Sequence, residues 1–143
     1  MPSSTALPTQ TMQTAHLLQD LFNAAVAAAM PQEQVARALE PYLKTKPKGR
    51  VLVVGMGKSA AAMAKAVEDT WAEAGYGEVE GLVITRYGHS VPTQSIEVIE
   101  AGHPVPDQNG MEGARQILQR VEPMTADDLV ICLISGGGSA LFT

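Results

Sequence analysis

The apolar run Leu129–Ile134 passes directly into the sequence Ser-Gly-Gly-Gly-Ser at positions 135–139. A short apolar run bounded by turn residues is typical of a buried strand, and consecutive glycines let backbone N–H groups approach a charged ligand with no Cβ in the way. The Ala-Leu-Phe that follows, at 140–142, resembles the first turn of a helix, whose free N–H groups also attract anions. This part of the sequence predicts an anion-binding turn. Because the chain stops inside it, we expect the front part of a longer protein.

The same order of elements occurs earlier in the chain. Val51–Val54 is a valine-rich run, Gly55–Ser59 is a turn, and the apolar residues from Ala60 to Trp71 have the spacing of one helix face. Further predicted elements are strands at Leu82–Thr85 and Ile96–Ala101, helices over 11–44 with a second helix opening at Pro31, and a helix at Gly110–Val121 with Met111, Ala114, Ile117, Leu118 and Val121 inward. Strands that alternate with helices favour a parallel sheet covered on both faces.

The predicted fold class is therefore α/β: a Rossmann-like three-layer α/β/α sandwich with a mainly parallel sheet and an N-terminal helical lead-in. Residues 1–10 are expected to be disordered and residues 11–143 to form the domain. The direction of Ile96–Ala101 is the least constrained, because the stretch before it is short for a parallel crossover. Ligands bind at the carboxyl ends of parallel strands, so the turns at 55–59 and 135–139 should lie side by side and face one cleft.

Composition excludes several classes of function. The chain has 10 Lys and Arg against 15 Asp and Glu, a net charge of −5, and only 4% aromatic residues, which argues against nucleic-acid binding. Apolar stretches such as Ala24–Met30 are too short for a membrane span, and the first 36 residues lack the basic residues of a targeting peptide. Cys132, inside an apolar run, is expected to be a buried thiol in a cytoplasmic protein. No His, Cys or Asp cluster has metal-ligand spacing.

The Gly55–Ser59 turn has two competing interpretations. Gly55, Gly57 and Ala60 satisfy the dinucleotide-binding pattern G-x-G-x-x-[G/A] between a strand and a helix. The acidic residue expected about 20 positions later is absent. Arg86 stands in that region instead and would suit the 2′-phosphate of NADP.

Lys58 and Ser59 resemble the end of a P-loop, but Leu52 stands where the first glycine of that motif is required. The P-loop interpretation therefore fails. What remains is a lysine at a helix N-terminus, opposed by the helix dipole, which an anion between the ammonium and the amides would explain. The alternative is a lysine that extends into solvent.

The histidines and the paired aspartates are weaker candidates. His103 lies in the proline-rich loop 103–107 at a strand end and could contact a ligand or act as a base, although a local hydrogen bond is an equal alternative. His89 has the same two interpretations, whereas His16 lies far from either glycine turn. Asp127 and Asp128 precede the strand at 129–134, at the end away from the site, so we expect them to be solvated turn residues.

Four blocks taken together resemble the class II glycerate 2-kinases, the family with a C-terminal MOFRL domain, in which some members carry the label hydroxypyruvate reductase. The blocks are Val-Gly-Met-Gly-Lys-Ser-Ala-Ala-Ala-Met-Ala (54–64), Val-Ile-Thr-Arg-Tyr-Gly-His (83–89), Glu-Ala-Gly-His-Pro-Val-Pro-Asp (100–107) and Leu-Ile-Ser-Gly-Gly-Gly-Ser-Ala-Leu (133–141). The resemblance implies phosphorylation of D-glycerate to 2-phosphoglycerate with ATP and Mg²⁺ in a cleft against a second domain. That domain would supply an arginine, and this stretch alone should be inactive.

The resemblance places the family's essential lysine at Lys58. It implies that substrate and phosphate contacts come from both glycine turns and from the histidine loop: Gly55, Gly57, Ser59, His103, Asp107, Ser135, Gly136, Gly137, Gly138 and Ser139. It implies small-molecule partners only, with neither nucleic acid nor membrane, and is compatible with a homodimer. Two alternatives stay open, an NAD(P)H-dependent hydroxypyruvate reductase and a non-catalytic module that binds phosphosugars.

Overall fold

The computed structural model describes residues 9–143, which fall into two units divided after Met30. The disorder predicted for residues 1–10 lies outside the described residues for positions 1–8. The first unit contains helix α1 (Thr9–Ala28), so the predicted helical start is confirmed. A lone helix cannot bury its apolar face, and Leu17, Leu21 and Phe22 are exposed. Within residues 9–143, no helix combines the length and apolar character needed to cross a bilayer.

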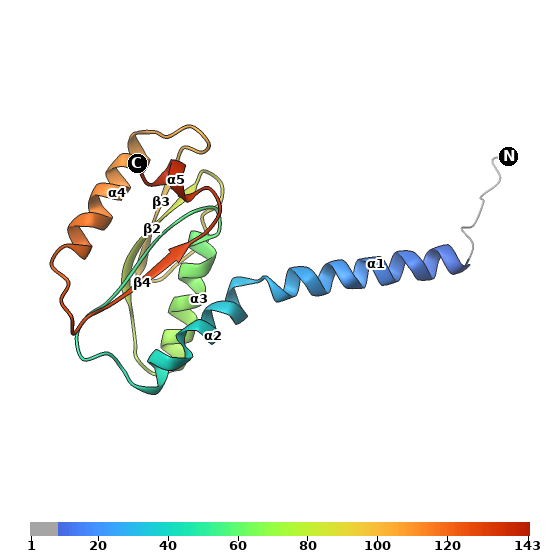
Figure 1. Ribbon diagram of the computed structural model, residues 1–143, viewed down its shortest axis with the longest axis horizontal. Coiled ribbons are helices and arrows are strands. Elements are labelled where there is room, and N and C mark those ends of the chain that lie inside the picture. Colours follow the sequence, from blue (N-terminus) through green and yellow to red (C-terminus); the bar gives the residue numbers. More distant parts are fainter. Residues whose placement is uncertain (1–8) are drawn as a thin grey trace. The chain divides into compact units, whose positions relative to one another are not determined.

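The second unit, Pro31–Thr143, contains one four-stranded sheet (Figure 1). Its elements in chain order are α2 (Pro31–Lys44), β1 (Val51–Met56), α3 (Ala60–Glu73), β2 (Glu80–Arg86), β3 (Ile96–Ala101), α4 (Gln108–Val121), β4 (Leu129–Ile134) and α5 (Gly138–Leu141). The strand order is β3-β2-β1-β4 and every pair is parallel. The predicted parallel sheet is confirmed, including the direction of β3.

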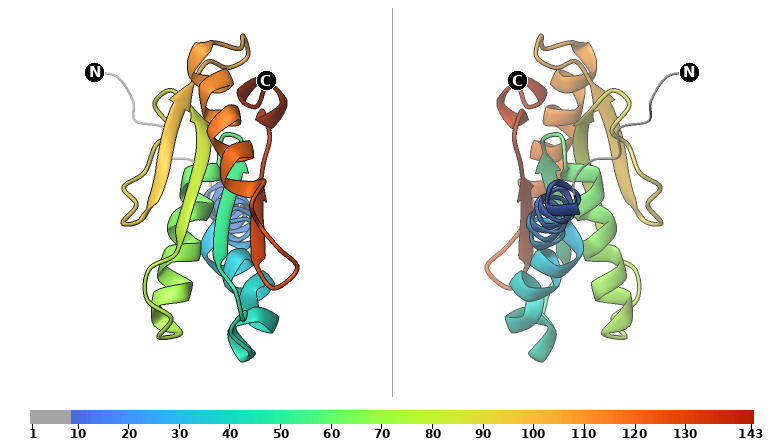
Figure 2. Two further views of the ribbon diagram at one scale, coloured as in Figure 1. Left: turned by 90° about the vertical axis from the view of Figure 1, so that its left-hand side faces the viewer. Right: turned by 90° about the vertical axis from the view of Figure 1, so that its right-hand side faces the viewer.

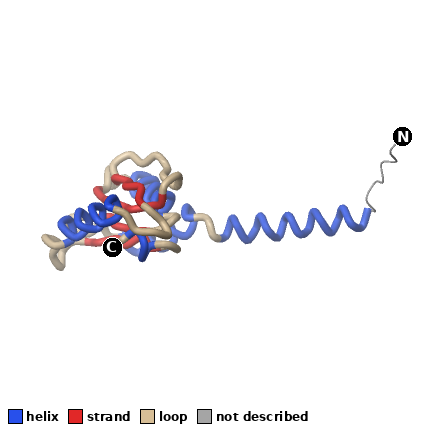
Figure 3. The backbone as a smooth tube through the Cα atoms, turned by 90° about the horizontal axis from the view of Figure 1, so that it is seen from above, coloured by secondary structure: helices blue, strands red, loops and turns tan. Residues whose placement is uncertain are grey.

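Helices cover both faces of this sheet (Figures 2 and 3). On one face, α2 and α3 bury Leu39, Val67 and Trp71 against the strands. On the other, α4 and α5 bury Ile117 and Leu141 in a second cluster. Apolar side chains therefore point in both directions from each central strand, as a parallel sheet in the middle of three layers requires. The predicted α/β/α sandwich is confirmed.

Strand β3 runs parallel to β2 although no helix connects them, and Glu68 of α3 explains how its start is held. The Glu68 carboxylate is buried and accepts hydrogen bonds from the backbone N–H groups of Gln94 (2.8 Å), Ser95 (2.7 Å) and Ile96 (2.8 Å). Burial raises the pKa of this carboxyl, but the bonds from these amides outweigh burial, so that the pKa is lowered overall. The buried carboxylate thus holds the end of the loop between β2 and β3, a connection that contains no helix.

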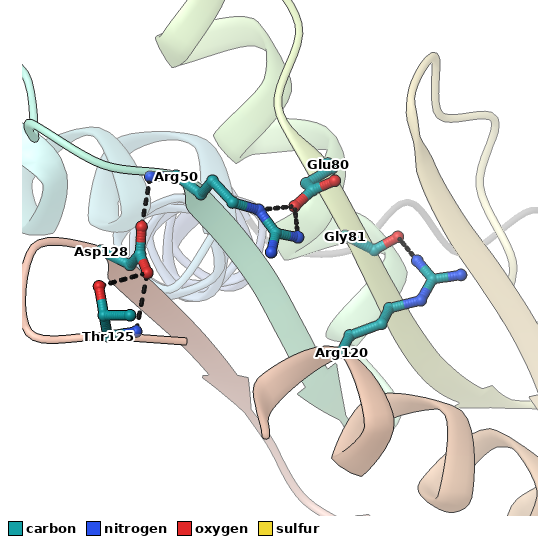
Figure 4. Close-up of polar contacts among 6 residues, drawn as sticks. All are labelled: Arg50, Glu80, Gly81, Arg120, Thr125 and Asp128. Atoms are coloured by element: carbon teal, nitrogen blue, oxygen red, sulfur yellow. Dashed lines mark hydrogen bonds and ion pairs between the residues drawn. The ribbon is translucent and has the colours of Figure 1, made fainter. Parts of the chain in front are cut away.

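The amino edge of the sheet carries polar contacts that order the loops there (Figure 4). Asp128 Oδ1 accepts a hydrogen bond from the Arg50 N–H (2.6 Å), and its Oδ2 accepts bonds from the N–H (2.7 Å) and hydroxyl (2.9 Å) of Thr125. Asp128 is therefore a turn residue, as predicted, although its carboxylate binds the chain rather than solvent alone. Arg50 also pairs with Glu80 at 2.6 Å.

Three expectations about burial are wrong. Cys132 is exposed rather than buried, because β4 is an edge strand and α4 packs mainly against β3 and β2. The face of β4 that carries Cys132 is therefore left partly uncovered, and Ile134 on the same face is also exposed. Met111 and Leu118 of α4, expected to point inward, are more than half exposed at 53% and 59%.

Candidate functional site

The two glycine turns lie side by side at the carboxyl edge of the sheet, as predicted. Strands β1 and β4 are neighbours, with Met56 beside Ile134 at their last residues. Each strand ends in one of the turns, and the order β3-β2-β1-β4 reverses direction between β1 and β4. In open parallel sheets ligands bind outside the carboxyl ends of the strands at such a switch point. The topology alone therefore marks this pair of turns as the candidate site.

Direct hydrogen bonds join the two turns. The backbone N–H of Lys58 donates to the carbonyl oxygen of Gly136 at 3.0 Å, and the N–H of Ser59 donates to Ser135 Oγ, also at 3.0 Å. The N–H of Ser135 in turn donates to the Met56 carbonyl oxygen at 3.1 Å. The turns therefore form one bonded unit rather than two independent loops.

These bonds show that the first turn does not offer its amides to a ligand. The N–H groups of Gly57, Lys58, Ser59 and Ala60 all have acceptors within the chain. Gly57 is buried with φ +126°, and a Cβ added there would lie 2.6 Å from the carbonyl oxygen of Ser135 and closer still to its Oγ. What this turn presents outward is the side chains of Lys58 and Ser59, both of which are exposed.

The second turn has the open backbone. No acceptor in the described residues 9–143 bonds the N–H of Gly136 or Gly137, and a Cβ on Gly136 would meet nothing within 4 Å. Gly137 has φ +90° and leads into α5, whose first N–H groups, on Gly138 and Ser139, have no partner within the helix. The turn at 135–139 thus continues directly into α5, whose first residues are Gly138 and Ser139. A backbone of this form is suited to hold an anion.

A cavity of about 420 Å³ opens at this turn. It is lined by Ser135, Gly137, Gly138 and Ser139 and by the apolar residues Met56, Ile134 and Phe142. The combination of apolar surface with a few convergent polar groups is typical of small-molecule sites.

His103 lies against this turn although it comes from the loop after β3. A Cβ added to Gly137 would be only 2.7 Å from His103 Nε2, so the imidazole occupies the space that the missing side chain leaves. His103 is half-buried. The structure thus brings together Lys58, His103 and the turn at 135–139, three regions that are distant in sequence.

The ammonium group of Lys58 is unpaired at the carboxyl edge of the sheet. Among the ion pairs of the described residues, none involves Lys58. Its carbonyl oxygen lies 3.4 Å from the hydroxyl of the fully buried Thr85, and its N–H is held by Gly136. The backbone of Lys58 is therefore fixed from both sides while its ammonium group remains available to an anion.

Asp107 is placed differently from the other predicted residues. Its Oδ1 accepts the N–H of Gly110 at 3.0 Å as the N-cap of α4, and its Oδ2 accepts the hydroxyl of Tyr87 at 2.7 Å. The hydrogen bond from Tyr87, with those from the amides of Gly102 and Gly110, lowers the pKa of the Asp107 carboxyl. These bonds give Asp107 a structural role: it caps α4 and connects the loop after β3 to Tyr87.

Sequence reasoning did not single out four residues that shape the site. Met56 and Phe142 line the cavity, Thr85 holds the Lys58 carbonyl, and Tyr87 holds Asp107. Thr85 and Tyr87 had a detectable signal, because each is a polar residue at the end of the apolar strand β2. His89 lies nearby and is exposed, with its N–H bonded to the Arg86 carbonyl oxygen at 3.1 Å.

Comparison with known families matches residues 17–143 to a domain described as a domain of unknown function, DUF4147. The chain belongs to the DUF4147 family. A relative in Agrobacterium vitis, named putative hydroxypyruvate reductase, is 46% identical over 125 residues, which are 87% of this DUF4147 chain and 27% of the relative. The glycerate 2-kinase of Pyrococcus horikoshii is 45% identical over 96 residues, 66% of this chain and 20% of that protein.

Structural comparison agrees. The crystal structure of glycerate kinase from Thermotoga maritima matches this DUF4147 chain with a TM-score of 0.74 and 35% identity, covering 92% of this chain and 30% of that one. The resemblance to glycerate 2-kinases predicted from the four sequence blocks is therefore confirmed. The chain spans less than a third of the length of each of these relatives.

Proposed function

We propose that the whole protein containing this chain transfers the γ-phosphoryl group of ATP to the 2-hydroxyl of D-glycerate, giving 2-phosphoglycerate, ADP and a proton. The observation that carries this proposal is the unpaired Lys58 bonded through its backbone to an open glycine turn at the sheet's switch point. The names of the relatives from Pyrococcus horikoshii and Thermotoga maritima support the same substrate.

The residues present suit phosphoryl transfer, in which catalysis is mostly positioning and charge neutralisation. The N–H groups of Gly136 and Gly137 and the hydroxyl of Ser139 would hold phosphate or carboxylate oxygens. Lys58 would offset negative charge on the transferring group, and His103 would face the same oxygens. Mg²⁺ would bind with the nucleotide phosphates, as it usually does in kinase sites.

We further propose that a second domain of the MOFRL type closes this site and contributes an arginine, so that residues 1–143 alone bind ligands without turnover. This follows the resemblance rather than any contact in the chain. Expressing residues 1–143 beside the full-length protein tests it, because a fragment with full glycerate kinase activity would contradict the need for the second domain.

A reductase is the second candidate, favoured by the Rossmann-type strand order, the G-x-G-x-x-A pattern and the name of the Agrobacterium vitis relative. The environment of Gly57 weighs against it. In dinucleotide sites the second glycine of the pattern lets the pyrophosphate approach the backbone closely. Here the open side of Gly57 is filled by Ser135, and the neighbouring amides are already bonded.

The deciding experiment is a pair of assays on the full-length protein. One follows ADP formation from ATP with D-glycerate, and the other follows oxidation of NADH and of NADPH with hydroxypyruvate. We expect turnover in the first assay only. Turnover only in the second would establish the reductase, and saturable ligand binding with no turnover in either would favour the non-catalytic module.

A further inference from the structure

Tyr87 connects the loop that follows β2 to the loop that follows β3 at the carboxyl edge of the sheet. It follows β2, and its hydroxyl donates to Asp107 Oδ2 at 2.7 Å, just before α4. The amide of Asn109 completes the arrangement, donating to Tyr87 Oη at 3.1 Å and to the Glu100 carbonyl oxygen at 3.2 Å. The phenol therefore both donates and accepts, which fixes the direction of its hydrogen.

Asp107 closes the loop that carries His103. Its carboxylate lies against Gly102 at one end of the loop, where an added Cβ would be 3.1 Å from Asp107 Oδ2, and accepts the N–H of Gly110 at the other end. The same segment is held from the side by the N–H of Tyr87, which donates to the Ala101 carbonyl oxygen at 3.3 Å. The carboxylate thus spans residues 102–110, and the imidazole of His103 projects from this span onto Gly137.

We propose that Tyr87 is a positioning residue for His103: through Asp107 it holds the 102–107 loop so that Nε2 of His103 stays against the phosphate-binding turn. This inference rests on the proposed function, because it gives His103 a place in the same site. Tyr87 itself does not touch the turn; it acts on the loop that does.

Substitution of Tyr87 by phenylalanine isolates this role. The Tyr87 side chain is 50% exposed, so the ring of phenylalanine retains what packing there is and only the hydroxyl is lost. Asp107 keeps its bonds to the amides and still caps α4. Tyr76 offers a matched control, since its hydroxyl also makes one short hydrogen bond, 2.6 Å to the Leu43 carbonyl oxygen, on the α2 side of the fold.

The test is a double-mutant cycle in the full-length protein. We expect Tyr87→Phe to lower kcat by about tenfold, the effect of losing one hydrogen bond to a charged group, with KM for ATP unchanged. In a His103→Ala background the same substitution should change kcat by less than about twofold, because the residue through which Tyr87 acts is gone. Tyr76→Phe should leave kcat unchanged in both backgrounds.

A second readout does not depend on activity. The ring signals of His103 in a proton–nitrogen or proton–carbon NMR spectrum should shift in Tyr87→Phe and stay in place in Tyr76→Phe. Unshifted His103 signals, or equal losses of kcat from Tyr87→Phe in both backgrounds, would overturn the inference while leaving glycerate phosphorylation intact. If the protein phosphorylates no glycerate, the proposed function fails, and the NMR comparison alone decides whether Tyr87 positions His103.

Discussion

Ser135 Oγ accepts a hydrogen bond from the backbone N–H of Ser59 across 3.0 Å, linking the turn after β4 to the turn after β1. Ser59 is the N-cap residue of α3, and its own side chain makes no capping hydrogen bond. The Ser135 hydroxyl therefore provides the acceptor for the Ser59 N–H. The Ser135 hydroxyl therefore both caps the start of α3 and connects the two turns of the candidate site.

Replacing Ser135 by alanine should remove the hydrogen bond between Ser59 and Ser135. We expect a loss of about 1 kcal/mol in the free energy of unfolding, the usual contribution of one such hydrogen bond. We also expect a lower kcat, because only the backbone bonds from Lys58 to Gly136 and from Ser135 to Met56 then connect the two turns. Urea unfolding of full-length protein measures the first effect. Ser90→Ala, at an exposed loop position, is the control and should change neither quantity.

Lys58→Ala should reduce kcat for glycerate phosphorylation by about 10²–10³, on the order of 3–4 kcal/mol, with a much smaller change in KM for ATP. A charge aimed at the transferring group stabilises the transition state more than the bound substrates. Lys58→Arg should restore only part of the rate, because a planar guanidinium does not replace a compact ammonium. Lys48→Ala, an exposed lysine in the connector before β1, should keep wild-type kinetics, and a near wild-type kcat for Lys58→Ala would remove Lys58 from the site.

Two glycine substitutions should separate stability from binding. Gly57→Ala forces a side chain into φ +126° and against Ser135, so we expect a loss of roughly 1–3 kcal/mol or more in unfolding free energy. Gly136→Ala meets open space and should leave thermal stability nearly unchanged while weakening ligand binding, because its methyl group would stand on the open side of the turn, where the proposed anion would bind. Thermal denaturation with parallel calorimetric titration of ATP distinguishes them, and equal stability of the two variants would contradict this account.

The lowered pKa of Glu68 should account for part of the loss of folding stability in acid. Its pKa is lowered from 4.5 in the folded protein, so its contribution to stability is present above the unfolded value and is lost as pH falls through the folded value. Glu68→Gln should abolish this part of the dependence below about pH 4.5, at some cost in stability at pH 7. Denaturant unfolding from pH 7 to 3 measures it, with the exposed Glu78→Gln as control; identical profiles for wild type and Glu68→Gln would show that the carboxylate does not pin β3.

Sequence reasoning predicted the sheet and the pairing of its glycine turns because local patterns determine both. Apolar runs that lead into glycine-rich turns identify β1 and β4, and the strand-end rule places their turns on one edge. It did not predict which turn is open. The open turn is determined by the bonds that Lys58 and Ser59 donate to Gly136 and Ser135, 78 and 76 positions away, and by which strand lies beside β1. The burial expected for Cys132 is wrong for a related reason, because an apolar run does not distinguish an edge strand from a central one.

The Ser59–Ser135 contact has a further consequence for how this protein acquires its site. The contact joins residues 76 positions apart, so it forms only after β1 and β4 have paired. Pairing of strands so far apart in the sequence is slow, because closing a long loop costs chain entropy before the contacts form. Local helices such as α3 can form early without bringing the two turns together. The candidate site is thus complete only after these distant strands have paired, and a ligand that binds there would stabilise only chains that have reached this stage.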